Sequence, residues 1–168
     1  MSRIIKYRDV IDDVWNLVQQ PDGFDSALLN EGFWIVPLDL YRSLTEELQS
    51  STRIGFWIAN DIELETIKGF LSSAPVIAVH FPVFSDGRGF SIARSLRDRY
   101  DYQGELRVIG YYIPDQLYYL SRCGFDAFAL PADIQEADLQ EMLERFEDFT
   151  EHYQAATDDP QPLFRRRA

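Results

Sequence analysis

The loop at residues 84–91 is the segment of this chain best suited to chemistry, because it combines glycines, a carboxylate and a guanidinium between an apolar run and a predicted helix. Glycines let a ligand approach the backbone closely, and a helix start offers free amide N–H groups. Arg88 adds a positively charged guanidinium with several N–H donors. A phosphate, sulfate or carboxylate group is held by groups of this kind. The predicted ligand-binding residues are Ser85, Asp86, Gly87, Arg88, Gly89 and Gln116.

A structural role is the simpler interpretation of the same loop. A tight strand-to-helix turn needs glycine and a capping side chain, which Asp86 or Ser91 can supply. The loop also lacks the GxGxxG order of a dinucleotide-binding fold and the lysine of a phosphate-binding loop. From the sequence, a turn and an anion site both remain open.

Three side chains are candidate proton carriers for catalysis: Asp86, Asp115 and His80. Asp115 follows Pro114 at a predicted helix start, where a carboxylate stabilises the positive end of the helix without doing chemistry. His80 lies in a predicted strand, and a histidine needs partners to act as a base or a metal ligand. His152 is the only other histidine and lies far along the chain, so we expect no metal site.

Cysteine usage and the N-terminus indicate the compartment. Cys123 is the only cysteine, so an internal disulfide is excluded, and its place at a predicted helix C-terminus favours a buried, unreactive thiol. Residues 1–8 lack the features of a signal peptide, and no apolar run approaches the ~20 residues that cross a bilayer. We expect a cytoplasmic protein that does not contact a membrane.

Charge and aromatic content indicate the kind of partner. The formal net charge is −12, from 28 acidic and 16 basic residues, and such a field repels nucleic acid. Residues 111–128 are crowded with tyrosine and phenylalanine, and adjacent aromatics on one helix cannot all face a core. Some of them are expected to line a pocket or an interface, so a homodimer or docking onto another protein is a hypothesis.

The apolar pattern predicts an α/β fold of about five β-α units forming a mainly parallel sheet, either open and doubly wound or partly barrel-like, with helices on both faces. A single domain is expected over residues 1–154, and residues 155–168 are expected to form a flexible tail. An N-terminal β-hairpin is predicted, with strands at Ile4-Ile5 and residues 14–18. The later strands are predicted at residues 33–38, 54–59, 76–81, 106–110 and 126–130, and the helices at residues 39–49, 60–72, 89–100, 114–123 and 135–153.

Several segments resemble one bacterial family. They are FPVFSDGRGFSIAR at residues 81–94, LRDRY at 96–100, GELRVIG at 104–110, DQL at 115–117 and RCGFDAF at 122–128. Together they are similar to a domain-of-unknown-function family (number nine-three-four), closely over residues 81–130 and more loosely over residues 3–78. Members of that family are labelled oxidoreductases involved in sulfite reduction. The chain departs from the usual pattern at Tyr111, where relatives often have aspartate, and at Val83, where lysine is common.

The resemblance implies a pathway more than a reaction. It implies an accessory protein of sulfate assimilation that acts with sulfite reductase or with a neighbouring enzyme. The alternative, argued from the loop at residues 84–91, is a small enzyme acting on an anionic substrate. No cofactor and no established catalytic residue follow from the resemblance, so whether the chain is an enzyme stays open.

Overall fold

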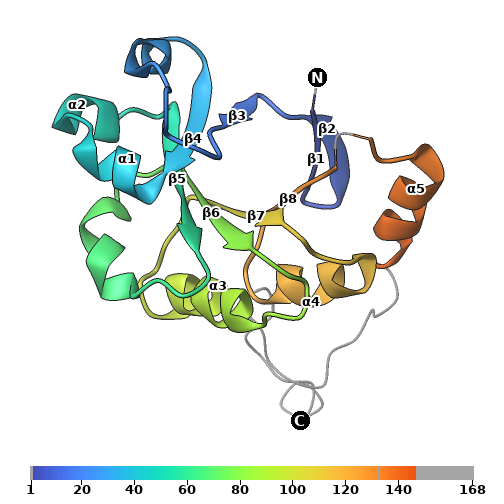
Figure 1. The fold of residues 1–168 in the computed structure, drawn as a ribbon. Helices are drawn as coiled ribbons and strands as arrows, with labels where there is room; N and C mark the ends of the chain where they lie inside the picture. The colour runs from blue at the N-terminus through green and yellow to red at the C-terminus, as the bar shows by residue number, and fades with distance from the viewer. Residues whose placement is uncertain (1, 132, 147–168) are drawn as a thin grey trace.

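The computed structural model describes residues 2–131 and 133–146, which form one eight-stranded sheet with helices around it (Figure 1). The strand order is β2-β1-β8-β7-β6-β5-β4-β3. Neighbours from β3 to β8 run parallel, and β1 runs antiparallel to both β2 and β8. The strands are β1 (Arg3–Lys6), β2 (Asp9–Asp12), β3 (Trp15–Leu17), β4 (Phe33–Pro37), β5 (Ile54–Ala59), β6 (Val76–Phe81), β7 (Glu105–Gly110) and β8 (Ala127–Ala129).

The sheet curls into a half-barrel with the helices on its convex side (Figure 1). The partly barrel-like alternative is therefore confirmed, and the open doubly wound sheet with helices on both faces is wrong. The helices are η1 (Ser26–Asn30), α1 (Leu38–Ser43), α2 (Glu46–Gln49), η2 (Leu64–Phe70), α3 (Arg88–Asp98), η3 (Pro114–Gln116), α4 (Leu117–Arg122) and α5 (Glu136–Glu144), where η marks a 3-10 helix.

The N-terminal hairpin exists, but its second strand is not the predicted one. β1 pairs with β2 through a turn at Tyr7 and Arg8, whose φ angles are 49° and 75°. Positive φ at both central residues is the geometry of the two-residue turn that best fits strand twist. The predicted second strand at residues 14–18 instead pairs in parallel with β4, as β3, at the far edge of the sheet.

The two edge strands, β2 and β3, are consecutive in the chain. Only Asp13 and Val14 separate them, so their adjoining ends lie at most ~11 Å apart. The Asp13 amide donates to the Ser2 carbonyl 2.8 Å away, and the Asp13 carboxylate accepts from the Trp15 amide at 3.1 Å. The chain itself thus joins the two edges of the curled sheet, from the end of β2 to the start of β3.

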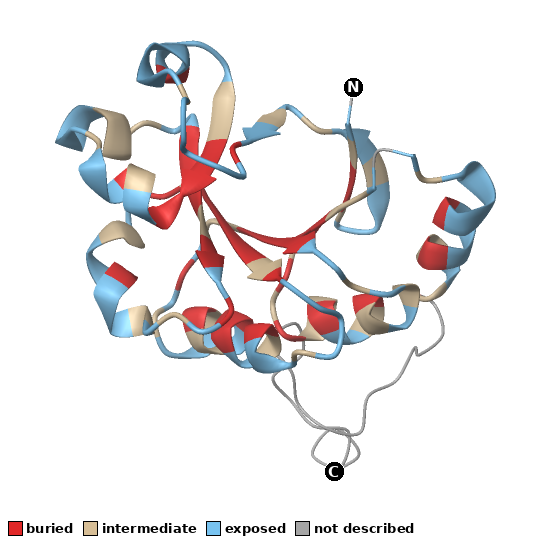
Figure 2. Cartoon of the chain, viewed as in Figure 1, coloured by how far each residue is buried: buried red, intermediate tan, exposed pale blue. Residues whose placement is uncertain are grey.

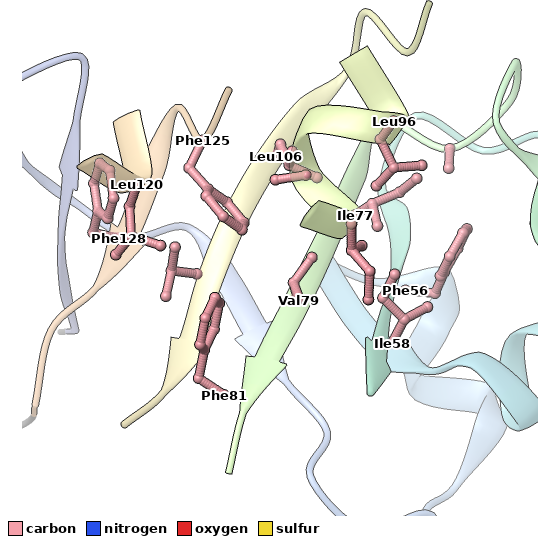
Figure 3. Packing of buried hydrophobic residues seen from close by; sticks show 14 of the residues in the cluster. Phe56, Ile58, Ile77, Val79, Phe81, Leu96, Leu106, Leu120, Phe125 and Phe128 are labelled. Carbon is pink, nitrogen blue, oxygen red and sulfur yellow. The ribbon is translucent and has the colours of Figure 1, made fainter. Parts of the chain in front are cut away.

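Side chains along each strand point alternately to the two faces of the sheet, and this produces two apolar layers. Side chains facing outward, such as Phe56, Val79 and Leu106, pack against the helices, as Figure 3 shows for β5 to β8. Inward-facing Ile35, Val76, Ala78 and Ile109 form a second, smaller cluster, flanked by Trp15, Trp57 and Ala129. Figure 2 shows the buried residues concentrated on the sheet and on the helix faces turned toward it.

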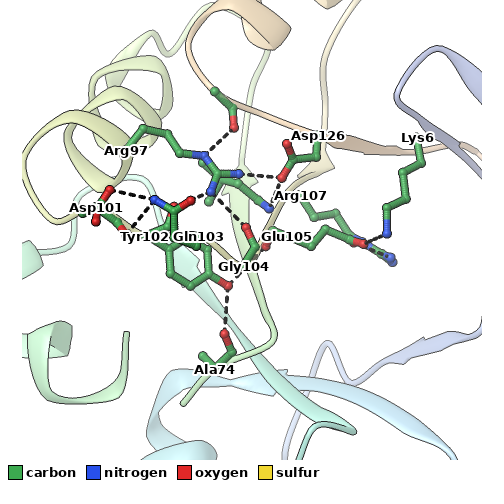
Figure 4. A network of polar contacts seen from close by, with 12 residues as sticks. Lys6, Ala74, Arg97, Asp101, Tyr102, Gln103, Gly104, Glu105, Arg107 and Asp126 are labelled. Carbon is green, nitrogen blue, oxygen red and sulfur yellow. Dashed lines mark hydrogen bonds and ion pairs between the residues drawn. The ribbon is translucent and has the colours of Figure 1, made fainter. Parts of the chain in front are cut away.

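Buried charges occupy the inner side of the sheet near the strand starts. Glu105 and Arg107 face inward because they alternate with outward-facing Leu106 and Val108. Arg107 lies 2.8 Å from Glu105, and Lys6 of β1 lies 2.7 Å from the same carboxylate (Figure 4). Arg107 also lies 2.8 Å from Asp13. These four residues are named here the inner ionic network.

A second polar cluster fastens α3 to the starts of β7 and β8 (Figure 4). The Arg97 guanidinium donates to the carbonyls of Tyr102, Gly104 and Gly124 and pairs with Asp126. The Asp126 carboxylate also accepts from the Leu106 amide at 2.9 Å. Burial raises the pKa of Asp126, and the hydrogen bond from the Leu106 amide and the Arg97 charge work against that rise.

Several predicted helices are shorter or broken. The helix expected over residues 39–49 divides into α1 and α2 because Thr45 caps a new start, accepting from the Leu48 amide. The helix expected over residues 60–72 is the 3-10 helix η2, and the one over residues 114–123 divides into η3 and α4, ending before Gly124 at φ 107°. The predicted end of the last helix, the tail at residues 155–168 and His152 lie outside the described residues.

Candidate functional site

The loop after β6 holds an internal ion pair. The Arg88 guanidinium places Nε 3.0 Å and Nη2 2.6 Å from the two Asp86 carboxylate oxygens, and the Arg88 amide donates to the same carboxylate at 3.2 Å. The hydrogen bonds from Arg88 hold the pKa of Asp86 well below its ordinary value, and Asp86 in turn raises the pKa of Arg88. Asp86 therefore stays ionised at neutral pH and neutralises the one cation of the loop.

This pairing describes a closed turn more than an open anion site. An anion reaching Arg88 must compete with the Asp86 carboxylate for the same guanidinium N–H groups. Ser85 lies exposed beside them and makes no hydrogen bond within the described part of the chain. The predicted ligand residues of this loop are adjacent in space, but their charges face one another.

Asn60 is a buried polar residue beside this loop, at the start of the helix predicted over residues 60–72. It follows β5 directly, it is 4% exposed, and its Oδ1 lies 3.5 Å from Arg88 Nη2. The amide is near enough to Asp86 to help lower the pKa of that carboxyl. Within the described residues, Asn60 Nδ2 nevertheless makes no hydrogen bond with the usual geometry. A polar residue directly after a buried strand was the available sequence signal.

The two glycines of the loop have different roles. A Cβ on Gly89 would lie 2.3 Å from Cζ of Phe81, which is fully buried at the end of β6. Glycine at this position thus lets the start of α3 pack directly on the sheet. A Cβ on Gly87 would meet nothing closer than 3.9 Å. Gly89 therefore has a packing role that the anion-site prediction did not include.

Gln116 connects the loops that follow β6 and β7. Its Nε2 donates to the Phe84 carbonyl at 2.8 Å, and its Oε1 accepts from the Ile113 amide at 3.2 Å. The NH2 group and the oxygen of the Gln116 side chain are thus both hydrogen-bonded to backbone atoms. Gln116 is adjacent to the predicted loop, as expected, and in this arrangement it fixes the relative position of the two loops.

The three candidate proton carriers do not come together. Asp115 is exposed, and its carboxylate lies 3.3 Å from Nε of Arg145 on the far side of η3. His80 faces the inner side of the sheet, where its ring lies 5.7 Å from that of Trp57. Asp86 belongs to the loop beyond the strand end. No pair of these groups shares a site, and shared proton transfer among them is not supported.

Two adjoining hollows open where the parallel strands end, on the inner side of the curled sheet, and are named here the mouth cavity. Their volumes are about 400 Å³ and about 820 Å³. The side chains of His80, Trp57 and Gln20 line only the smaller hollow, and the larger hollow extends to β8 and α5. Both are lined by Leu17, Gln19, Ile109, Gly110 and Tyr111. The sequence prediction did not include this cavity, because residues 14–18 were paired with Ile4-Ile5 and not with β4.

Exposed apolar side chains gather on the segments that follow β6 and β7. Val83 and Phe84 are 51% and 53% exposed, and Ile113 and Tyr119 are 38% and 56% exposed. The Tyr119 ring packs 5.1 Å from that of Phe90 in α3, and Gln116 links Phe84 to Ile113. These four residues are named here the apolar patch. They agree with the expectation that some aromatics would not enter the core.

Cys123 and the possible metal ligands offer no further site. Cys123 is buried and is not part of a disulfide. Within residues 2–131 and 133–146, no three histidine, cysteine, aspartate or glutamate side chains gather in a way that holds a metal ion. Over the same residues, no helix has the length and apolarity needed to cross a bilayer.

Comparison with known proteins identifies one match. A family model described as "Bacterial protein of unknown function (DUF934)" matches residues 55–164, which run from β5 to beyond the described residues. No curated protein and no solved structure matches the chain.

Proposed function

Because this chain belongs to the bacterial family of unknown function DUF934, we propose that it is an accessory protein of sulfite reduction, which docks onto sulfite reductase or a neighbouring enzyme of sulfate assimilation. The pathway rests on the label that members of the family carry. The mode of action rests on the apolar patch. The three candidate proton carriers do not come together, and the described residues hold no cluster of metal ligands, so we favour binding to an enzyme over catalysis.

The apolar patch is the observation that carries the docking proposal. Large apolar side chains exposed side by side are a feature of surfaces that bind other proteins. Here Val83, Phe84 and Ile113 belong to two loops that Gln116 connects, and Tyr119 belongs to α4, so the surface is formed before a partner arrives. The net charge of −12 adds long-range attraction to a partner with a basic face.

A binding measurement with purified sulfite reductase tests docking. The Phe84→Ser/Tyr119→Ser double variant is expected to weaken the affinity at least tenfold, because both side chains are half exposed and contribute little to the core. Val14→Ser is the matched control, since Val14 is 61% exposed on the link between β2 and β3. Equal binding by wild type and the double variant would contradict docking through the patch.

Growth of a strain lacking the gene tests the pathway. We expect failure on sulfate and on sulfite as sole sulfur source, and normal growth on sulfide. The wild-type gene should restore growth and the double variant should restore it poorly. Normal growth of the deletion strain on all three sources, with no paralogue present, would end the assignment to sulfite reduction.

A small enzyme or binding protein for an anion is the second candidate, and the buried amide of Asn60 is the observation that favours it. An anion that displaced Asp86 from Arg88 would also find the free N–H groups of Asn60 Nδ2 in reach of the same place. Sulfite, sulfate and phosphate can each be titrated against the labelled protein by NMR. Arg88→Ala should abolish the shifts and Arg94→Ala should preserve them, whereas unaltered binding by Arg88→Ala would remove this candidate.

A further inference from the structure

We propose that the mouth cavity binds a planar aromatic or heteroaromatic molecule that is neutral or positively charged. The inference is independent of the docking proposal, because it concerns the inner side of the sheet. In folds with parallel strands, ligands collect beyond the C-terminal ends of those strands. The hollows of about 400 Å³ and about 820 Å³ lie at that end and fall within the usual range of small-molecule pockets, roughly 300–1,000 Å³.

The smaller hollow has a flat, fixed aromatic wall. The indole Nε1–H of Trp57 donates to the Val18 carbonyl at 2.9 Å, which holds the ring in one orientation. The His80 ring lies 5.7 Å away at an angle of 55°. Tyr111, 71% exposed, borders both hollows. Aromatic rings pack best against other flat rings, so these walls favour a planar ligand.

Polar groups without protein partners line the same hollow. Within the described part of the chain, the side chains of His80, Gln19 and Gln20 make no hydrogen bond. A few convergent polar groups in an otherwise apolar pocket are what orient a bound molecule. The imidazole and the two amides therefore provide donors and acceptors for a ligand with one or two polar ring atoms.

Gly110 makes room for this arrangement. Its φ is 93°, a conformation that favours glycine, and a Cβ there would lie 2.9 Å from His80 Cδ2 and 2.3 Å from the Phe81 carbonyl oxygen. Glycine thus allows the imidazole to lie against the backbone of β7 at the strand end. The histidine occupies its place at the wall only because position 110 has no side chain.

The charge of the cavity decides which ligands fit. Asp133 and Asp138 line the larger hollow, and the described residues that line either hollow include no lysine or arginine. An oxyanion would find no cation there and would face two carboxylates. A neutral ring avoids this cost, and a cationic ring gains from both the carboxylates and the aromatic faces.

A ligand series that differs only in charge tests the proposal. Quinoline, N-methylquinolinium and quinoline-4-carboxylate can be titrated against the labelled full-length protein at neutral pH, following the indole N–H signal of Trp57 by NMR. We expect quinoline and N-methylquinolinium to shift that signal and the carboxylate to bind at least tenfold more weakly. His80→Leu and, separately, Gln19→Ala should weaken binding of the first two about fivefold, the usual value of one hydrogen bond.

The controls separate loss of the site from loss of the fold. Gln19 is exposed, so Gln19→Ala keeps the core intact even if His80→Leu disturbs it. Gln103→Ala, an exposed change near the strand starts, should leave all three affinities unchanged. The proposal is overturned if none of the three compounds moves the Trp57 signal, if the carboxylate binds most tightly, or if both cavity variants bind like wild type.

Discussion

Arg107 in β7 lies 2.8 Å from Asp13, the residue that follows β2, and this ion pair ties the middle of the sheet to the short link between its two edge strands. Both side chains are almost fully removed from water, at 4% and 10% exposure. Arg107 also pairs with Glu105, which Lys6 holds from β1. The curl of the sheet is thus fixed from inside by charges as well as by the chain.

Removing the Arg107 charge should destabilise the fold strongly. Arg107→Met leaves Asp13 buried without its cation, and breaking a buried ion pair from one side costs about 3–5 kcal/mol. Urea unfolding followed by circular dichroism measures the change. Arg94→Met is the matched control, because Arg94 and Asp98 form a half-exposed helix pair worth ~0.3–0.5 kcal/mol. Equal losses for the two variants would show that the inner ionic network contributes no special stability.

The pairing of Asp86 with Arg88 gives a pH prediction. The pKa of Asp86 is lowered in the folded chain, so its contribution to stability is complete above the ordinary aspartate pKa of ~3.9 and is lost as the pH falls below it. An NMR titration of the Asp86 carboxyl carbon should give a midpoint below that value. Arg88→Gln should move the midpoint upward, while Arg94→Gln should leave it in place. An unchanged midpoint in Arg88→Gln would mean that the ion pair does not persist in solution.

The two loop glycines should respond differently to the same change. Gly89→Ala places a methyl group 2.3 Å from the buried Phe81 ring, and overpacking of this kind costs about 1–3 kcal/mol. Gly87→Ala, two residues away, meets no atom closer than 3.9 Å and should be nearly neutral. Thermal unfolding of both variants measures the difference. A neutral Gly89→Ala would show that α3 can move away from β6 at no cost.

Two tyrosines near the end of α3 provide another matched pair. The Tyr102 hydroxyl donates to the carbonyls of Ala74 and Glu105 in a buried place, and the Tyr100 hydroxyl donates to exposed Glu65. Tyr102→Phe removes a buried hydrogen-bond donor from the Ala74 carbonyl and should cost about 1–3 kcal/mol, whereas water replaces the partner lost in Tyr100→Phe. Denaturant midpoints that fall equally in both variants would contradict this account.

The sequence predicted β5 and β6 well because both are nearly continuous apolar runs between polar segments. Residues 54–59 and 76–81 match β5 and β6 without a shift. The hairpin was misplaced because residues 14–18 carry the same apolar signal whether they pair with β1 or with β4. A local apolar pattern does not indicate which of two strands is the pairing partner. The turn at Tyr7 and Arg8 also lacks the glycine or asparagine that usually marks a hairpin turn.

The site was predicted only in part for a similar reason. The composition of the loop at residues 84–91 was visible, but the direction of the Arg88 side chain, back toward Asp86, depends on contacts in three dimensions. His80 was selected from its residue type, whereas its neighbours Trp57 and Gln19 come from other strand ends and share no spacing with it. The mouth cavity exists because the sheet curls, and curvature leaves no mark in any single strand.

The pairing of β1 with β8 has a consequence for synthesis on the ribosome. The hairpin of β1 and β2 is synthesised before β8, yet the edge of β1 that faces β8 can be covered only when β8 has emerged. Until then the nascent chain carries an unpaired strand edge that can add foreign strands. We therefore expect the growing chain to be most prone to such pairing in the interval between the synthesis of β1 and that of β8.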